Sequence, residues 1–149
     1  MRSIVQRVAW AKVEVDGQVV GQIERGLLVL LGCAKDDEAR DADVLIDKTV
    51  NLRIFENDAG KMDKSVLDLR GSLLVVSQFT LLGDVSRGRR PSFDHAMPPE
   101  LAEPMYEAFV TKCRAILPTE AGRFRAHMHV TSLNDGPVTL WLDSRELRS

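Results

Sequence analysis

The sequence predicts one layered α/β domain over residues 1–149. Short apolar segments separated by turn residues indicate many strands, and two longer segments carry apolar residues at helical spacing. Two of the strands, residues 27–33 and 72–76, are apolar at nearly every position, so both of their faces must be covered. Strands of this kind require a second layer, which the two helices can form. No repeat, linker or low-complexity segment interrupts the sequence.

Three strands and a helix are predicted in the first third of the chain. Residues 5–15 alternate as an extended strand, Asp16-Gly17 is typical of a two-residue hairpin, and residues 18–23 form the returning strand. The buried strand 27–33 comes next. A helix then begins after acidic residues that suit its positive N-terminal end. Its apolar face is formed by Ala42, Leu45, Ile46 and Val50.

The middle of the chain combines short strands with a long loop. Residues 51–55 are predicted to be extended, and a polar turn follows at 56–61. Strand 72–76 continues directly into the polar segment 77–81. The loop 83–99 then contains most of the glycines and prolines of this half.

A second helix and two strands are predicted in the last third. The helix starts near Ala102, which places Pro104 in its first turn, where proline is tolerated. Two strands, residues 125–133 and 137–142, are joined by a turn at residues 134–136. The apolar stripe of the helix is Leu101, Met105, Ala108, Phe109, Cys113 and Ile116.

Composition predicts a globular protein that stays in the cytoplasm. The apolar fraction of 44% and the charged fraction of 28% are ordinary for such proteins. No apolar run is long enough to span a bilayer, and the N-terminal residues lack the apolar region of a signal peptide. Cys33 and Cys113 cannot form a disulfide framework and are predicted core residues. The net charge of -2 argues against a protein that coats nucleic acid by charge alone.

Two polar features are candidates for a functional site. Ser77, Gln78 and Thr80 follow a buried strand at its carboxyl end, where ligands bind in layered sheets. Strand ends also need polar residues for structural reasons alone, so both interpretations stay open. Gly136-Pro137 is either a simple turn or a segment whose bare backbone is offered to a ligand.

The segment Arg87-Gly88-Arg89-Arg90 is the one dense basic cluster in the sequence. Arginine binds phosphate with a bidentate fork, and a loop of this composition suits phosphate contacts. A single patch of this size fits contact with one end of an RNA better than the wrapping of a duplex. A solvated surface loop is the alternative.

Histidines and serines give weaker signals. His127 and His129 lie two residues apart on a predicted strand, hence on one face, as in the start of many metal sites. No cysteine or carboxylate with suitable spacing joins them, so no metal site is predicted. Nothing like a nucleophile elbow surrounds any serine, which disfavours Ser/His/Asp catalysis.

Several segments along the chain form one collinear pattern. The most specific are Ser-Gln-Phe-Thr-Leu at residues 77–81 and Asn-Asp-Gly-Pro-Val-Thr at residues 134–139. Residues 1–8, 26–32, 51–55 and 88–93 belong to the same pattern. The pattern covers essentially the whole chain and resembles the D-aminoacyl-tRNA deacylase family, which includes the D-tyrosyl-tRNA deacylases.

The resemblance implies a fold, an activity and a partner. The fold is a barrel-like core of mostly antiparallel sheet with two main helices. The activity is hydrolysis of the ester of D-aminoacyl-tRNA, and of mischarged glycyl-tRNA, as chiral proofreading in translation. The chain is expected to be a homodimer in which each pocket receives Gly136 and Pro137 of its neighbour, joined by a cis peptide bond. An L side chain would collide with that wall, whereas a D side chain would point away. The resemblance implies that the protein uses no cofactor or metal and that it binds neither a membrane nor DNA.

The same resemblance implies roles for further residues. Residues 77–80 are expected to hold the 3′-terminal adenosine and the ester, and backbone N–H groups near Gln78 and Phe79 to stabilise the oxyanion. Thr80 is one candidate nucleophile. The other route, which we favour, has the terminal ribose 2′-hydroxyl orienting the attacking water, because no side chain is placed to activate Thr80. The implied catalytic residues are Ser77, Gln78, Phe79 and Thr80. The implied substrate-binding residues are Ala126, Met128, Gly136 and Pro137, and the tRNA-binding residues are Arg87, Arg89 and Arg90.

Two positions depart from the family pattern. Members usually carry glycine in Phe-Gly-Ala-x-Met, where this chain has Arg125, and the position after alanine is commonly acidic, where this chain has His127. We expect the class of reaction to be the same as in other members, but we expect the amino-acid preference or the access to the pocket to differ from theirs. Alternatively, Arg125 points outward and adds to the tRNA-binding surface.

Two other function classes stay open. A tRNA-binding module that has lost catalysis would keep the basic loop but tolerate loss of Gly136 and Pro137. A metal-dependent hydrolase built on His127 and His129 would be inactivated by a chelator. A related deacylase family with a trans Gly-Pro accepts some L-substrates, and the segment at 77–81 argues against that variant.

Overall fold

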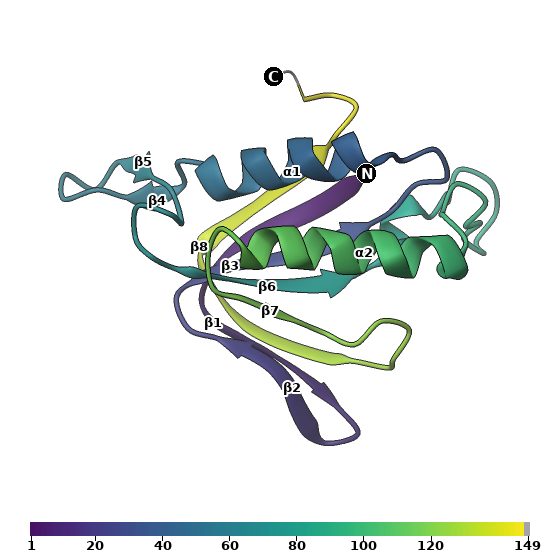
Figure 1. The fold of residues 1–149 in the computed structure, drawn as a ribbon, viewed down its shortest axis with the longest axis horizontal. Coiled ribbons are helices and arrows are strands. Elements are labelled where there is room, and N and C mark those ends of the chain that lie inside the picture. The colour runs from purple at the N-terminus through teal and green to yellow at the C-terminus, as the bar shows by residue number, and fades with distance from the viewer. Residues whose placement is uncertain (148–149) are drawn as a thin grey trace.

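A curved six-stranded sheet, a small two-stranded sheet and two long helices make up the computed structural model, which describes residues 1–147 (Figure 1). In chain order the elements are β1 (Arg2–Val15), β2 (Gln18–Ile23), β3 (Gly26–Gly32), α1 (Ala39–Asn51), β4 (Phe55–Glu56), β5 (Met62–Lys64), β6 (Ser72–Ser77), η1 (Phe79–Leu82), α2 (Pro99–Arg114), β7 (Thr119–Ala121) and β8 (His129–Asp143).

Strand β1 organises the large sheet. It pairs antiparallel with β3, with β2 and, along nearly its whole length, with β8. Strands β3 and β6, and β6 and β7, pair in parallel. The sheet curls until its two ends meet. Gly21 of β2 lies so close to β7 that a Cβ atom added there would be 2.6 Å from the carbonyl oxygen of Ala121. The predicted barrel-like core with two main helices is therefore confirmed, as a mixed sheet that nearly closes.

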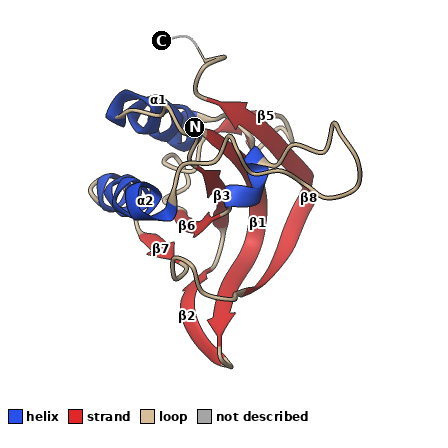
Figure 2. Cartoon of the chain, turned by 90° about the vertical axis from the view of Figure 1, so that its right-hand side faces the viewer, coloured by secondary structure: helices blue, strands red, loops and turns tan. Residues whose placement is uncertain are grey.

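Both faces of the central strands are buried, as predicted. Successive residues of a strand point to opposite faces. Leu27 and Leu73 pack in the core beneath the helices, whereas Leu28 and Leu74 pack in a second core inside the curl of the sheet. Figure 2 shows α1 and α2 together on one side of the sheet. Each of these leucines contributes about 1.5–3 kcal/mol through burial, so the central strands hold a rigid frame.

The first third of the chain confirms most of the predicted elements. Asp16 and Gly17 have φ values of 50° and 76°, which the tight hairpin between β1 and β2 requires. Helix α1 buries the predicted apolar face. It also continues through Asn51, so the first residue of the extended segment predicted at 51–55 is helical, and only Phe55 of that segment belongs to a strand. The Asn51 side chain donates to the Asp47 carbonyl oxygen at 2.9 Å, which stabilises the last turn of the helix.

Strand β6 matches the predicted strand 72–76 and includes one further residue, Ser77. The chain then leaves the sheet, and the polar segment that follows forms the 3₁₀ turn η1. The Leu81 N–H donates to the Gln78 carbonyl oxygen at 3.2 Å, and the Gly83 N–H donates to that of Thr80 at 3.0 Å. These local hydrogen bonds replace the ladder that a longer strand would need.

Helix α2 starts earlier than predicted. It begins at Pro99, where a missing N–H costs nothing, and Pro104 lies inside it rather than in its first turn. The predicted stripe is only partly buried, since Leu101 and Ile116 are 62% and 46% exposed. Helix α2 turns Tyr106 toward the sheet instead, because the Tyr106 hydroxyl can donate a hydrogen bond to the Val75 carbonyl oxygen, at 2.7 Å. The buried face of α2 is Ala102, Tyr106, Phe109, Val110 and Cys113.

The end of the chain is one long strand, not two strands joined by a turn. Gln6 of β1 pairs with Thr139, and Val8 pairs with Asn134, so four residues of β8 leave the ladder between these pairs. We call residues 135–138 the Gly-Pro bulge. The turn predicted at residues 134–136 is wrong because β1 offers a continuous edge on which β8 resumes pairing in the same direction.

Candidate active site

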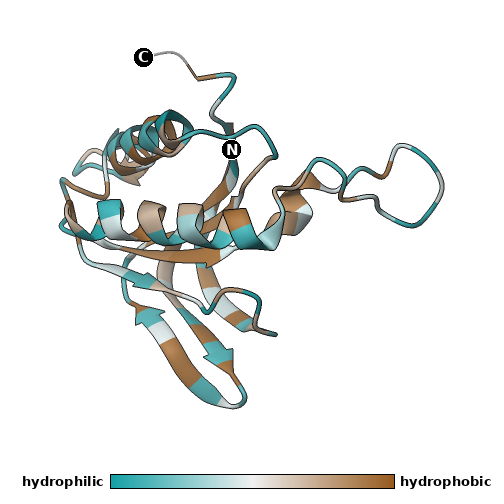
Figure 3. Cartoon of the chain, turned by 45° about the vertical axis from the view of Figure 1, so that its right-hand side comes forward, coloured by the Kyte–Doolittle hydropathy of each residue, from teal (hydrophilic) through white to brown (hydrophobic). Residues whose placement is uncertain are grey.

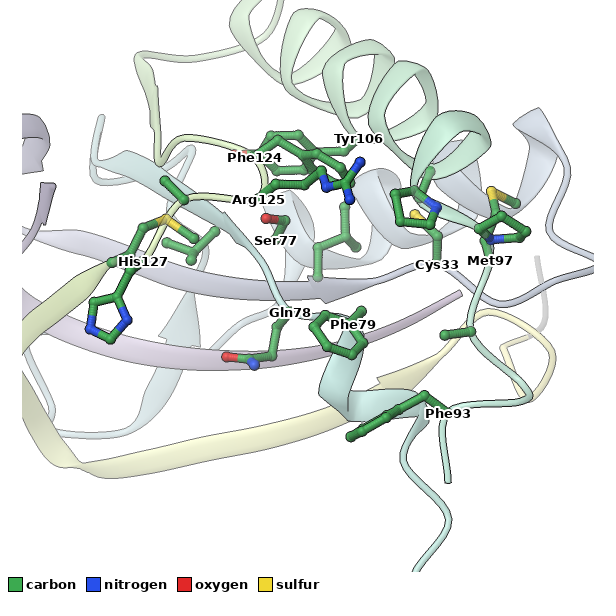
Figure 4. Close-up of a pocket in the computed structure, with 18 of the residues that line it drawn as sticks. Cys33, Ser77, Gln78, Phe79, Phe93, Met97, Tyr106, Phe124, Arg125 and His127 are labelled. Atoms are coloured by element: carbon green, nitrogen blue, oxygen red, sulfur yellow. The ribbon is translucent and has the colours of Figure 1, made fainter. Parts of the chain in front are cut away.

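A cavity of about 710 Å³ opens beside the end of β6. Its walls come from β6, the loop that precedes α2, the first turns of α2 and residues 124–128. Figure 4 shows side chains from these segments converging on one space. Five residues expected at the site line this cavity: Ser77, Gln78, Phe79, Ala126 and Met128.

The sheet fixes the floor of the cavity. Ser77 ends β6 opposite Leu31 of β3, and the Gln78 N–H donates to the Leu31 carbonyl oxygen at 2.7 Å. Gly32 allows this close approach, because a side chain there would lie 2.8 Å from the Gln78 carbonyl oxygen. The Gln78 N–H is therefore not free to bind an oxyanion. The sequence could not show this, because the hydrogen bond joins two distant segments.

The first turn of η1 supplies free backbone donors in its place. The first N–H groups of any helix lack partners within that helix, and here they belong to Phe79 and Thr80. Thr80 itself is exposed and lies beside the cavity rather than among the residues that line it. The Gln78 side-chain amide donates to the Thr80 hydroxyl, which fixes that side chain.

Two titratable groups of the cavity wall, the Cys33 thiol and the Tyr106 hydroxyl, are poor bases. Burial raises the pKa of the Cys33 thiol to about 12 and that of the Tyr106 hydroxyl to about 12. Both groups are therefore neutral at neutral pH, and Tyr106 already donates to the Val75 carbonyl oxygen. Arg125 and His127 also line the cavity, and no aspartate or glutamate is among the described lining residues.

Aromatic residues that the sequence did not single out complete the wall. Tyr106, Phe124 and Phe93 all line the cavity. The Phe93 ring meets the Phe79 ring edge to face, with centroids 5.0 Å apart. Phe93 comes from the loop between η1 and α2, so its contact depends on how that loop folds back. Tyr106 was detectable in principle, because it lies one helical turn beyond the buried Ala102.

The Gly-Pro bulge lies outside the cavity of its own chain. Gly136 and Pro137 are exposed, are joined by a cis peptide bond and do not line the cavity. Arg7 holds the bulge from one side, since its Nε donates to the Asp135 carbonyl oxygen at 2.7 Å and its Nη1 to that of Ile54 at 2.7 Å. Asn134 holds it from the other, accepting from the Val138 N–H at 2.9 Å. The bulge is therefore exposed but fixed.

The basic cluster lies on the loop between η1 and α2. Figure 3 shows this loop projecting away from the sheet. Asp84 and Ser92 close its base with two backbone hydrogen bonds of 2.7 and 2.9 Å. The residues of this loop that precede Phe93 do not line the cavity. Its three exposed arginines are Arg87, Arg89 and Arg90.

The two histidines near the cavity contact each other. The rings of His127 and His129 lie 5.2 Å apart, edge to face. Within residues 1–147 no three histidine, cysteine, aspartate or glutamate side chains are grouped as metal ligands. In the same range, no helix has the length and apolar character needed to cross a membrane.

Comparisons with known proteins agree over nearly the full chain. The model of the D-Tyr-tRNA(Tyr) deacylase family matches residues 4–143. The D-aminoacyl-tRNA deacylase of Thermosipho africanus is 55% identical over 148 residues, which are 99% of each chain. The solved structure of the c-Myc DNA Unwinding Element Binding Protein superposes with a TM-score of 0.91 at 41% identity, covering 96% of this chain and 98% of that one.

A second solved structure extends the similarity in fold. A probable eukaryotic D-amino acid tRNA deacylase superposes with a TM-score of 0.83 at 17% identity, covering 95% of this chain and 98% of that one. At that identity the likeness shows the fold alone. Together, the family match and the full-length identity establish that this chain belongs to the D-Tyr-tRNA(Tyr) deacylase family.

Proposed function

We propose that this D-aminoacyl-tRNA deacylase selects its substrate by excluding L-aminoacyl groups with the Gly-Pro bulge of a second copy of the chain. One observation carries the proposal. The cavity and the fixed, exposed bulge are separate in one chain, because neither Gly136 nor Pro137 lines the cavity. Two copies that exchange bulges would unite the two features in each of two complete sites.

Exclusion by the bulge follows from its chemistry. Gly136 has no side chain and Pro137 has no N–H, so the pair presents carbonyl oxygens and a short apolar ring to whatever approaches. A wall of this kind leaves an L side chain no room. A D side chain on the same α-carbon points to the other side, and glycine has no side chain to reject. Cleavage of D-aminoacyl and glycyl esters, with L-esters spared, is the expected pattern.

Exposed apolar side chains along β1 and β8 support a homodimer. Trp10 pairs with Leu133, and Ile4 pairs with Trp141, along the ladder that joins the two strands. Trp10, Leu133 and Trp141 are 36%, 51% and 48% exposed. Large exposed apolar side chains are typical of interaction sites. The Gly-Pro bulge belongs to β8, so a copy docked along this strand would carry its bulge toward the partner.

Hydrolysis without a side-chain base fits the cavity. The free N–H groups of Phe79 and Thr80 would stabilise the oxyanion that forms when water adds to the ester carbonyl carbon. The terminal ribose 2′-hydroxyl would orient that water, and the 3′-oxygen would leave with the proton that the water loses. Thr80 would shape the site through its contact with Gln78. Ser77, Ala126 and Met128 would enclose the terminal adenosine and the aminoacyl group.

The basic loop would hold the tRNA near the cavity. Arg87, Arg89 and Arg90 are exposed on a loop whose closing segment contributes Phe93 to the cavity wall. Phosphates close to the 3′ end would reach this loop while the ester occupies the cavity. Aminoacyl-tRNA is used by ribosomes in the cytoplasm, and we place the activity there.

Deacylation of matched D-Tyr-tRNA and L-Tyr-tRNA in the presence of EDTA tests the proposal. We expect rapid loss of the D-ester alone. Thr80→Ala should retain activity within roughly tenfold, whereas a tRNA that ends in 2′-deoxyadenosine should resist hydrolysis. Loss of activity in Thr80→Ala with full cleavage of the deoxy substrate would instead establish Thr80 as nucleophile. Inhibition by EDTA would favour a metal-dependent hydrolase, and cleavage of neither ester would leave a binding role.

A further inference from the structure

Arg125 has an unusual backbone and a side chain at the cavity. Its φ of 64° lies in the left-handed region, which disfavours residues with a side chain by about 1 kcal/mol. Arg125 lies within a tight turn that is closed by a hydrogen bond of 3.2 Å from the Ala126 N–H to the Arg123 carbonyl oxygen. Arg125 lines the cavity, and Figure 4 shows its side chain extending over Ser77 toward Tyr106 rather than away from the site.

The guanidinium of Arg125 has no counter-charge in the described chain. None of the ion pairs formed within residues 1–147 includes Arg125. The described cavity wall contains no carboxylate, and its Cys33 and Tyr106 are neutral. The first residues of α2 also line the cavity and bring the positive end of a 16-residue helix to it. The cavity wall therefore carries the positive charge of Arg125, and no carboxylate of the described chain pairs with it.

We propose that Arg125 is a substrate-binding residue whose guanidinium binds an oxyanion of the substrate inside this cavity. The inference rests on the proposed function, because it concerns a group carried by D-aminoacyl-tRNA. Guanidinium binds carboxylate and phosphate through two parallel hydrogen bonds. Two parts of the substrate carry such a group: the side chain of a D-aspartyl or D-glutamyl ester, and the phosphodiester next to the terminal adenosine. Both share the chemistry that Arg125 recognises.

The test compares substrates that differ only in charge. D-Asp and D-Asn are charged onto one tRNA, and a 3′-O-(D-asparaginyl)-adenosine serves as a substrate without phosphodiester. The values of kcat/KM are measured for the wild type, Arg125→Gln, Arg125→Lys and Arg125→Gly, the last of which suits the backbone at this position. Arg123→Gln is the matched control, because Arg123 is an exposed arginine two residues away that does not line the cavity.

Each source of the oxyanion gives its own result. If Arg125 binds the carboxylate, Arg125→Gln lowers kcat/KM for D-Asp-tRNA about tenfold and leaves that for D-Asn-tRNA unchanged. If it binds the phosphodiester, both tRNA substrates lose about tenfold and the adenosine ester loses nothing. In either case Arg125→Lys recovers part of the loss, Arg125→Gly does not, and Arg123→Gln resembles the wild type.

Two results would overturn the inference while the proposed function stands. One is an Arg125→Gln variant with unchanged kcat/KM on all three substrates. The other is an equal loss on all three, the adenosine ester included, since that would mean a structural role. A wild type that leaves D-Asn-tRNA and D-Asp-tRNA intact would contradict the proposed function itself, and the inference with it.

Discussion

The cavity and the Gly-Pro bulge both lie where a strand departs from regular pairing, yet their surroundings are opposite. After Ser77 the chain turns into η1, which packs against β3 and β1, and a hollow of about 710 Å³ lies beside this turn. At Gly136 the chain leaves the ladder outward, on a strand that pairs only with β1, and leaves exposed backbone. One region is a recess, and the other is a projection.

The difference indicates how selectivity can arise with little chemistry. In the proposed mechanism the recess, with its apolar side chains and the N–H groups of η1, binds the ester and stabilises the oxyanion without distinguishing the hand of the α-carbon. The projection is held by Arg7 and Asn134 and offers only backbone, so it can restrict space but cannot catalyse. A site with both properties needs both regions, and within one chain they do not meet. The predictions below separate the two contributions.

Filling the recess should have the largest effect. Ala126→Trp places a large ring in the cavity and should lower kcat/KM for D-Tyr-tRNA by roughly 100-fold or more, since small displacements of bound reactants already cost that much. The oligomeric state, measured by light scattering, should be unchanged. Arg123→Trp adds the same ring just outside the cavity and serves as the control. Near-normal activity in Ala126→Trp would show that the cavity is not the reaction site.

Changing the projection should alter selectivity rather than rate. Gly136 has a φ of 153°, and an added side chain would lie 2.8 Å from the Val138 nitrogen, so Gly136→Ala must shift the bulge. We expect L-Tyr-tRNA to be cleaved and the ratio of D to L rates to fall at least tenfold. Gly17→Ala is the matched control, because Gly17 also has positive φ but no atom nearby. Equal ratios in the two variants would contradict the role of the bulge.

The Tyr106 hydroxyl should matter for stability and not for selectivity. Tyr106→Phe removes one of the two hydrogen bonds that the Val75 carbonyl oxygen accepts, the other coming from the Gly122 N–H. We expect the free energy of unfolding to fall by about 0.5–1.5 kcal/mol with an unchanged ratio of D to L rates. Burial raises the pKa of Tyr106 from 10.0 to about 12. Stability from this group is therefore present below pH 10 and is lost toward pH 12, as only the unfolded state ionises there. Urea titrations at several pH values should show a smaller alkaline loss in Tyr106→Phe.

The basic loop should give the smallest effect, on affinity alone. Arg89→Gln should raise KM for D-Tyr-tRNA several-fold and reduce the slope of log affinity against log salt by about one. The ratio of D to L rates should stay constant, because the loop lies outside the recess and the projection. Arg70→Gln, which changes an exposed arginine near the start of β6, is the control. An unchanged salt slope in Arg89→Gln would remove this loop from the tRNA contact.

The elements that local sequence determines were predicted well. The hairpin at Asp16-Gly17 and strand β2 were correct because two residues with positive φ set the turn on their own. Helix α1 was correct on its buried face because its period is local. Distant contacts decided the rest. Strand β8 could not be identified as one strand, since residues 134–136 look like a turn until β1 is seen to pair on both sides of them.

The site shows the same division. Ser77, Ala126 and Met128 were expected at one pocket through the family resemblance, and the structure brings them to one cavity. Backbone N–H groups near Gln78 and Phe79 were expected as oxyanion donors, but that of Gln78 donates to Leu31, on a strand that no local pattern connects with this segment. Phe93 was missed because its position depends on the fold of a long loop. The sequence thus indicated which segments meet, but not which atoms remain free.

A heterodimer in which each chain lacks one region tests the central claim most directly. One chain carries Ala126→Trp and the other carries Gly136→Ala, and the heterodimer is purified through two different tags and assayed on D-Tyr-tRNA and L-Tyr-tRNA. If the bulge acts in the neighbour's cavity, the one open cavity receives an intact bulge. The heterodimer then cleaves the D-ester at about half the wild-type rate and spares the L-ester. Cleavage of the L-ester at about half the rate of the Gly136→Ala homodimer would show that each bulge serves its own chain and would contradict the account.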